Sequence, residues 1–102
     1  MAQVTVGVPT YNGETHLEES LLALVAQDHP DFRVIVLDNA SSDRTAEIAQ
    51  DICSSDLRFF YHRNVETVPA TVNFRIVWSL ADSPYFLWRA DDDVSSPSYL
   101  SA

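Results

Sequence analysis

Four short runs of apolar residues divide the sequence, and each ends at a proline or at a polar residue. They are residues 4–8, 32–37, 58–61 and 85–88. The first is rich in β-branched side chains and the second is apolar almost without interruption, a pattern typical of parallel strands that are covered on both faces. We therefore expect four strands, of which the third and fourth are short.

The segments between the first three runs show helical spacing of apolar residues. In the first segment, Thr15 and Glu18 form a capping box at the start of a helix. Its apolar positions are Leu17, Leu21, Leu24 and Val25. The second segment begins at residues 41–43, where any of three side chains suits an N-cap. Its inward positions are Ile48, Ala49 and Ile52. Two amphipathic helices are predicted here.

A third helix is predicted between the last two runs, with Thr67 as its cap and Pro69 in its first turn. One of its faces is apolar through Val72, Ile76 and Leu80, and its other side is apolar through Phe74, Val77, Trp78 and Ala81. An apolar surface all round a helix indicates burial. We therefore expect this helix to be deeply packed and Trp78 and Trp88 to lie in the core.

Strands that alternate with helices predict a right-handed parallel βαβ arrangement. We expect an α/β, Rossmann-like three-layer sandwich with a mostly parallel sheet and the strand order 3-2-1-4. A chain of 102 residues suffices for one core, so residues 1–102 are interpreted as one domain or part of one. A further helix is expected to start at Ser96 and Pro97.

Composition narrows the classes of protein. The chain is 46% hydrophobic and 21% charged, as in soluble globular proteins, and its net charge of -9 disfavours nucleic acid and anionic membranes as partners. No apolar run approaches the length of a membrane span. The one cysteine, Cys53, forms no internal disulfide and suits a small buried apolar position, so a cytoplasmic location is expected.

Polar residues follow three of the four predicted strands. They are residues 9–12 (PTYN), residues 38–39 (DN) and residues 91–93 (DDD). Parallel strand ends open on one edge of a sheet, so these segments are expected to meet there. Tyr11 offers a flat face for a nucleobase, Asp38 accepts a hydrogen bond from a base N–H, and the acidic triplet suits a hard cation that neutralises phosphates. These residue types suit a nucleoside diphosphate.

Each of these features has a simpler interpretation. The triplet alone fits a solvated turn, Asp38 fits the cap of the next turn, and Tyr11 fits a half-buried loop residue. Mg²⁺-dependent phosphoryl transfer through an aspartate is a rival chemistry, but it requires an acid directly after the first strand, where this chain has Pro9. Arg89 beside the triplet fits a partner either for Asp91 or for a phosphate. Neither of the two glycines belongs to a dinucleotide-binding or P-loop motif.

Three blocks of sequence together carry a family resemblance. Residues 4–12 (VTVGVPTYN), residues 34–45 (VIVLDNASSDRT) and residues 90–93 (ADDD), in this order and spacing, resemble family 2 glycosyltransferases of the GT-A fold. The resemblance covers nearly the whole chain. It implies a nucleotide-sugar donor, commonly a UDP or dTDP sugar, and a Mg²⁺ or Mn²⁺ ion.

The resemblance also implies individual roles. Tyr11 stacks on the base, Thr10 and the backbone of Pro9 line its pocket, and Asp38 binds its edge. Asp91 faces the ribose, while Asp92 and Asp93 are the metal-binding residues. Arg63 or Arg75 is a further residue that would assist the base or the phosphates.

Two departures from the family pattern affect these expectations. Ala90 stands where the family often has the first acid of an Asp-x-Asp-Asp turn, so the assignment within the triplet is open by one residue. The family's second half, which binds the acceptor and supplies the general base, has no counterpart in these residues. We therefore expect the donor-binding half of an inverting glycosyltransferase, inactive alone, with no catalytic residue of its own.

The alternative interpretation is a non-catalytic nucleotide-sugar-binding or assembly module. Both interpretations leave exposed the surface that the second half would cover, so both predict self-association into a homo-oligomer.

Overall fold

The computed structural model describes residues 4–27 and 31–89. Its strands are β1 (Val4–Thr10), β2 (Phe32–Asp38), β3 (Phe59–Arg63) and β4 (Tyr85–Trp88), and its helices are α1 (Leu17–Val25), α2 (Thr45–Ser55) and α3 (Ala70–Ser79). The sheet order is β3-β2-β1-β4, and all neighbouring strands are parallel. The predicted α/β class and strand order are therefore confirmed. The expected helix at residues 96–97 lies outside the described residues.

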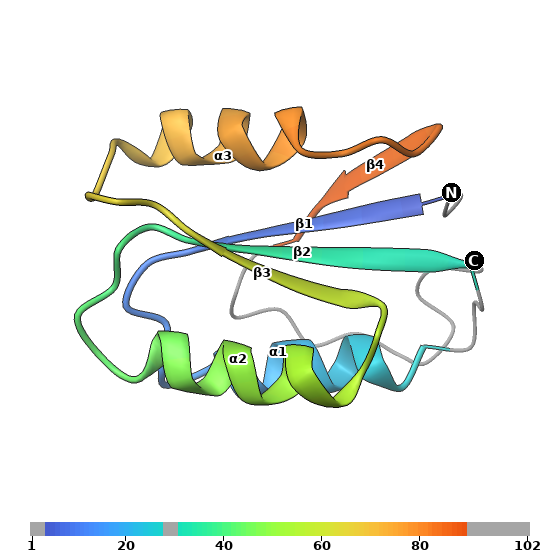
Figure 1. Cartoon of the computed structure of the whole chain (residues 1–102), viewed down its shortest axis with the longest axis horizontal. Coiled ribbons are helices and arrows are strands. Elements are labelled where there is room, and N and C mark those ends of the chain that lie inside the picture. Colours follow the sequence, from blue (N-terminus) through green and yellow to red (C-terminus); the bar gives the residue numbers. More distant parts are fainter. Residues whose placement is uncertain (1–3, 28–30, 90–102) are drawn as a thin grey trace.

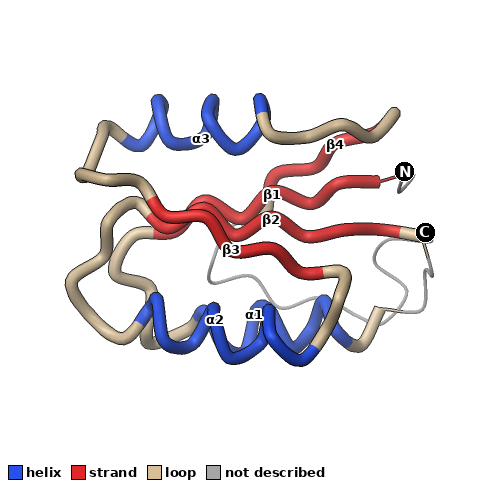
Figure 2. Tube along the Cα trace, in the orientation of Figure 1, coloured by secondary structure: helices blue, strands red, loops and turns tan. Residues whose placement is uncertain are grey.

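The sheet lies between two unequal layers of helix. Among the described helices, α1 and α2 cover one face and α3 lies over the other (Figure 1). The tube in Figure 2 shows the same arrangement, with the strands as the middle layer. This is the three-layer sandwich expected from the alternation of strands and helices.

The larger core lies between the sheet and the pair α1 and α2. Its α1 contribution is Leu17, Leu21 and Leu24, each fully buried, at the spacing that places residues on one helix face. Burial of each such leucine stabilises the fold by about 1.5–3 kcal/mol. Cys53 is half-buried against this core, and burial raises the pKa of its thiol to about 11, with nearby Asp56 adding to the effect.

Helix α3 is less buried than its sequence predicts. Only Asn73 and Val77 on this helix are buried, and the smaller core on this side of the sheet consists of Ile35, Leu37 and Val77, with Ile76 and Phe86 packed against it. The expectation of a deeply packed helix is wrong. The reason is geometric, because no described element lies over the outer side of α3 (Figure 1).

The two tryptophans are also not core residues. Trp78 is 56% exposed and Trp88 is 51% exposed. Trp88 is the last residue of β4, which is an edge strand of the sheet. Its indole N–H donates to the carbonyl of Phe74 at 3.2 Å, and its ring contacts the Phe86 ring edge-on. Their aromatic character alone predicted the core, and their position on the β4 side of the molecule reverses that prediction.

None of the three described helices has a side-chain hydrogen bond from its N-cap residue, so the predicted caps are not found. The nearest agreement is at α2, where Asp43, one residue before the N-cap Arg44, accepts a hydrogen bond through Oδ1 at 2.9 Å from the N–H of Thr45. No side chain caps α1, and Gly13 O accepts from Leu17 N instead of the predicted box at Thr15. Thr67 donates to Asn39 O and does not cap α3.

None of the helices in the described part of the chain has the length and apolar character needed to cross a bilayer.

Candidate functional site

The carboxyl ends of the strands meet on one edge of the sheet, as expected. Thr10 at the end of β1 lies opposite Asp38 at the end of β2, and Asp38 lies opposite Arg63 at the end of β3. Strand β4 is parallel to β1, with Trp88 opposite Gly7. The segments that follow β1 and β2 are therefore brought together. The predicted ligands Asp91, Asp92 and Asp93 lie outside the described residues.

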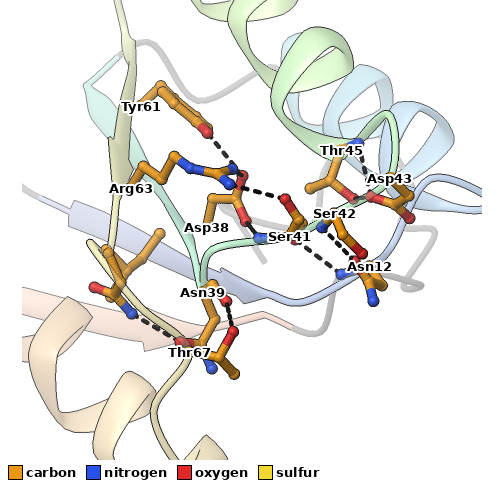
Figure 3. Close-up of polar contacts among 12 residues, drawn as sticks. Asn12, Asp38, Asn39, Ser41, Ser42, Asp43, Thr45, Tyr61, Arg63 and Thr67 are labelled. Atoms are coloured by element: carbon orange, nitrogen blue, oxygen red, sulfur yellow. Dashed lines mark hydrogen bonds and ion pairs between the residues drawn. The ribbon is translucent and has the colours of Figure 1, made fainter.

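Asp38 is a fully buried carboxylate with three donors around it. Its Oδ1 accepts from Ser41 N at 2.9 Å, and its Oδ2 accepts from the Tyr61 hydroxyl at 2.7 Å and from Arg63 at 2.9 Å (Figure 3). Its exposed fraction is 0%. A buried charge is tolerated only where it is paired and hydrogen-bonded, and these three donors satisfy that requirement.

Tyr61 and Arg63, the two β3 side chains that contact Asp38, differ in how they donate and in how far they are exposed. Burial raises the pKa of Tyr61, and its hydrogen bond to Asp38 adds to the rise, so the phenol stays protonated and donates at neutral pH. Arg63 also donates to Ser41 O at 2.9 Å, and its side chain is 43% exposed. One part of this guanidinium neutralises Asp38 while the rest remains open to solvent. Arg75, the other arginine considered from sequence, lies on an exposed position of α3.

Polar contacts lock the β1–α1 loop to the β2–α2 loop. Asn12 N donates to Ser41 Oγ, Ser42 N donates to Asn12 Oδ1, and Gly13 N donates to Thr45 Oγ1, each at 2.9 Å (Figure 3). Asn12 has a positive φ of 50°, a conformation that asparagine tolerates better than most residues. These contacts fix the backbone directly after Tyr11.

A small cavity of about 140 Å³ opens between the end of β1 and the start of α3. It is lined by Pro9, Thr10, Tyr11, Asn39, Ala70, Asn73 and Phe74. Three of the five residues predicted to bind the donor therefore share one cavity. Asp38 lies one residue before Asn39, with its carboxylate turned toward β3. The fifth, Asp91, is outside the described residues.

The contribution of α3 to this cavity was missed from sequence. Ala70, Asn73 and Phe74 lie on a helix whose distance from Tyr11 along the chain gives no local signal of contact. Tyr61 was also missed, although parallel pairing of β3 with β2 places the end of β3 beside Asp38. For Tyr61 and Arg63, the available signal was the predicted strand order, which places the end of β3 beside the end of β2.

Arg89 takes a different place from those considered. Its side chain is buried against α1, where its Nε donates to Ser20 Oγ at 3.2 Å. Its guanidinium is therefore directed to the two-helix side of the sheet. Among residues 4–27 and 31–89, no group of three His, Cys, Asp or Glu side chains is arranged to hold a metal ion. The predicted metal ligands Asp92 and Asp93 are not among those residues.

Comparison with known proteins assigns a family. The profile described as glycosyl transferase family 2 matches residues 5–102. The chain belongs to this family. This family 2 chain is 32% identical over 71 residues to a GalNAc(5)-diNAcBac-PP-undecaprenol beta-1,3-glucosyltransferase from Campylobacter jejuni, a match that covers 68% of the chain and 23% of the relative. The resemblance seen in the sequence blocks is confirmed.

Solved structures agree in fold with the family 2 chain. Staphylococcus aureus TarS, residues 1–349, superimposes with a TM-score of 0.89 at 26% identity, over 97% of this chain and 30% of that 1–349 chain. A TarS complex with UDP-GlcNAc gives a TM-score of 0.86 at 27% identity, covering 97% of this chain and 29% of that one. The mannosyltransferase PcManGT from Pyrobaculum calidifontis, in complex with GDP-Man and Mn²⁺, gives 0.84 at 27% identity over 91% of this chain and 28% of its own. The predicted GT-A fold class is confirmed.

The family 2 chain is much shorter than these proteins. It spans 23% of the Campylobacter enzyme and 29% of a Rickettsia typhi glycosyltransferase that matches 93% of it.

Proposed function

We propose that residues 1–102 are the donor-binding part of an inverting glycosyltransferase. In this proposal the whole enzyme transfers a sugar from a nucleoside diphosphate sugar, with UDP or dTDP as the nucleotide, to an acceptor hydroxyl. The observation that supports it most is the cavity lined by Pro9, Thr10 and Tyr11 at the carboxyl edge of a parallel sheet. The UDP-GlcNAc complex of TarS, a protein of similar fold, supports the same nucleotide class.

The nucleobase is assigned to this cavity. Tyr11 is 53% exposed and offers a ring face for stacking, while Pro9 and Thr10 line the floor. We also propose that Asp38 recognises the base edge, since a carboxylate has about four positions that accept hydrogen bonds and Asp38 has three donors in place. Because Asp38 is fully buried and faces β3, this contact requires the partly exposed Arg63 side chain to move when the nucleotide binds.

The diphosphate and the metal are assigned to the turn after β4. We propose that Asp91 faces the ribose and that Asp92 and Asp93 bind Mg²⁺ or Mn²⁺. Support comes from β4 itself, which is parallel to β1 and therefore runs toward the same edge of the sheet, and from Mn²⁺ in the PcManGT complex. A bound divalent ion would neutralise the departing diphosphate. The acceptor and the general base are assigned to residues beyond this chain.

Calorimetry with UDP, with and without Mn²⁺, tests the donor site. We expect heat of binding with the metal and its loss after EDTA treatment. Asp92→Ala should weaken UDP binding at least about ten-fold, because a metal ligand is removed. The matched control is Asp82→Ala, which removes an equal charge at an exposed position before β4. No heat at millimolar UDP, or equal weakening in both variants, would contradict the proposal.

A second proposal concerns assembly, and it also fits a non-catalytic binding module. Strand β4 is an edge of the sheet, and the residues around it are apolar and between 40% and 61% exposed. We define the β4 surface as Trp78, Tyr85, Leu87 and Trp88. Exposed apolar patches of this kind mark interaction sites, and an unpaired strand edge accepts a further strand. We propose that the isolated chain self-associates through the β4 surface.

We also place the protein in the cytoplasm. The proposal is supported by the single cysteine, which has no partner within the sequence for a disulfide, and by the nucleotide-sugar class of donor. Reactivity of Cys53 with a thiol reagent after unfolding, without prior reduction, would agree with this placement. Recovery of the protein only as a disulfide-linked dimer would count against it.

A further inference from the structure

A network of three asparagines joins the end of β2 to the loop before α3. Asn39 Nδ2 donates to Val68 O at 2.7 Å, and Asn39 Oδ1 accepts from Val68 N at 2.9 Å. Both polar groups of the Asn39 side-chain amide therefore bind the backbone of Val68, a residue of that loop. The Asn39 carbonyl accepts from the Thr67 hydroxyl at 3.1 Å (Figure 3). Asn39 N donates to Thr10 O at 2.8 Å, which connects the network to the end of β1.

Asn64 and Asn73 extend the network into α3. Asn64 Nδ2 donates to Asn39 Oδ1 at 3.0 Å and to Asn73 Oδ1 at 2.7 Å. Asn39 is 4% exposed and Asn73 is 3% exposed. Buried amides that satisfy one another specify a single arrangement of the elements that carry them, because breaking one bond leaves a buried polar group unpaired. Asn39, Asn64 and Asn73, the asparagine network, therefore hold the first turns of α3 against the strand ends.

This attachment determines one side of the cavity. Ala70, Asn73 and Phe74 line it from α3, and Tyr11 lines it from the β1–α1 loop. Phe74 follows directly after Asn73, so the network fixes the residue from which the phenyl ring projects. Phe74 is 42% exposed, and besides this cavity it lines a second one of about 390 Å³ together with Ala70, Thr71 and Trp88. A partly exposed aromatic side chain beside a cavity gains from a flat ligand that covers it.

We propose that Phe74 forms the second aromatic wall of the nucleoside cavity and that the asparagine network positions it. The proposal rests on the donor-binding function proposed above and identifies a base-contacting residue outside the three motif blocks. At about 140 Å³ the cavity is smaller than the roughly 300 Å³ at which pockets for whole drug-sized ligands begin. It therefore suits the base, with the ribose and diphosphate extending toward the strand ends.

The test is calorimetry of UDP, with Mn²⁺ present, on the wild type, Phe74→Ala and Phe60→Ala. We expect Phe74→Ala to weaken UDP binding about five- to ten-fold, the usual loss when one stacking ring is removed from a base. Phe60→Ala should leave the affinity within about two-fold of the wild type, because Phe60 is a phenylalanine of β3 that is 41% exposed, nearly as much as Phe74, but does not line the cavity. Equal affinity of Phe74→Ala and the wild type would overturn the proposal.

The possible outcomes distinguish the proposed role of Phe74 from the donor-binding function on which it rests. A wild type that binds no UDP overturns both. A wild type that binds UDP as tightly as Phe74→Ala does overturns only the role of Phe74. If Phe74→Ala does not fold, Phe74→Leu replaces it, since leucine keeps apolar volume but offers no flat face, and the same loss of affinity is expected. In the wild-type complex formed with diamagnetic Mg²⁺ in place of Mn²⁺, nuclear Overhauser contacts between the uracil H5 and H6 protons and the Phe74 ring are the direct observation, and their absence counts against the proposal.

The positioning role has a separate readout. Asn73→Asp keeps the size of the side chain but replaces the amide N–H that faces Leu37 O, at 3.4 Å, by an oxygen. We expect weaker UDP binding and loss of the contacts between uracil and Phe74, while affinity for pyrophosphate with Mn²⁺ stays unchanged. A general loss of structure would weaken both ligands together, and that result would overturn the positioning role.

Discussion

Asp38 illustrates how one residue can serve the fold and the site together. Its carboxylate is fully buried and holds the Ser41 backbone, the Tyr61 hydroxyl and the Arg63 guanidinium in one place. Without it, the Tyr61 hydroxyl and the Arg63 guanidinium would lose the acceptor that they share, although Arg63 would keep its bond to Ser41 O. The sequence suggested a base ligand or a turn cap. The turn contact with Ser41 is present, and the base contact stays a prediction.

The substitution Asp38→Asn tests the structural part of this role. The amide keeps one acceptor for Ser41 N but places N–H groups against Arg63, so we expect a loss of about 1–3 kcal/mol in the free energy of unfolding. Chemical denaturation measures it. The control is Arg44→Gln, which breaks the exposed pair with Glu47 and should change stability by less than about 0.5 kcal/mol. A stability of Asp38→Asn equal to that of the control would show that the buried pair is dispensable.

At the scale of elements, Gly7 is a point where β1, β4 and α3 approach one another closely. A Cβ at this position would lie 2.6 Å from a ring carbon of Phe86 and 3.1 Å from a methyl group of Val77. The absence of a side chain at Gly7 thus lets Phe86 pack under α3. This close approach supports the smaller core, which has few other buried residues.

Gly7→Ala should therefore destabilise the protein, even though alanine has a higher strand propensity than glycine. We expect a loss of about 1–3 kcal/mol in the free energy of unfolding, as for other overpacked cores. The double variant Gly7→Ala with Phe86→Leu should recover part of that loss, because the shorter side chain vacates the clash. Thermal unfolding of the four proteins in this cycle gives the coupling. Strictly additive effects would mean that Gly7 and Phe86 do not compete for space.

Helices α1 and α2 could be predicted because their buried residues repeat at one helical face. In α3 the same kind of pattern predicted the helix correctly but overestimated its burial. Phe74, Trp78 and Leu80 look like core residues by type, but type does not reveal whether any element lies over them. The cavity shows the same division. Pro9, Thr10 and Tyr11 follow a predicted strand and were found, whereas Phe74 depends on how a distant helix is tied to that strand.

At the scale of the whole molecule, charge and apolar surface oppose each other. The net charge of -9 repels a second copy, while the β4 surface favours one. The range of the repulsion falls from about 30 Å at 0.01 M salt to about 8 Å at 0.15 M. Salt should therefore decide which effect prevails.

We expect the dissociation constant of the dimer to fall several-fold between about 10 and about 150 mM NaCl. These two concentrations span roughly the screening lengths given above. Sedimentation velocity measures it. Leu87→Glu adds a charge within the β4 surface and should abolish association. The matched control, Leu57→Glu, adds the same charge at an apolar residue that is 95% exposed in the turn before β3, and it should associate as the wild type does apart from the added repulsion. A monomer at every salt concentration would exclude the β4 surface as a contact between copies.

The unequal helix layers also have a consequence for how such a site changes over evolutionary time. One side of the proposed nucleoside cavity is built on strands embedded in the larger core, where substitutions are costly. The opposite side belongs to α3, where the lining residue Asn73 is buried but Ala70 and Phe74 are exposed. Substitutions at these two exposed positions cost the fold little, so new nucleotide preferences would arise there first while the strand side stays constant.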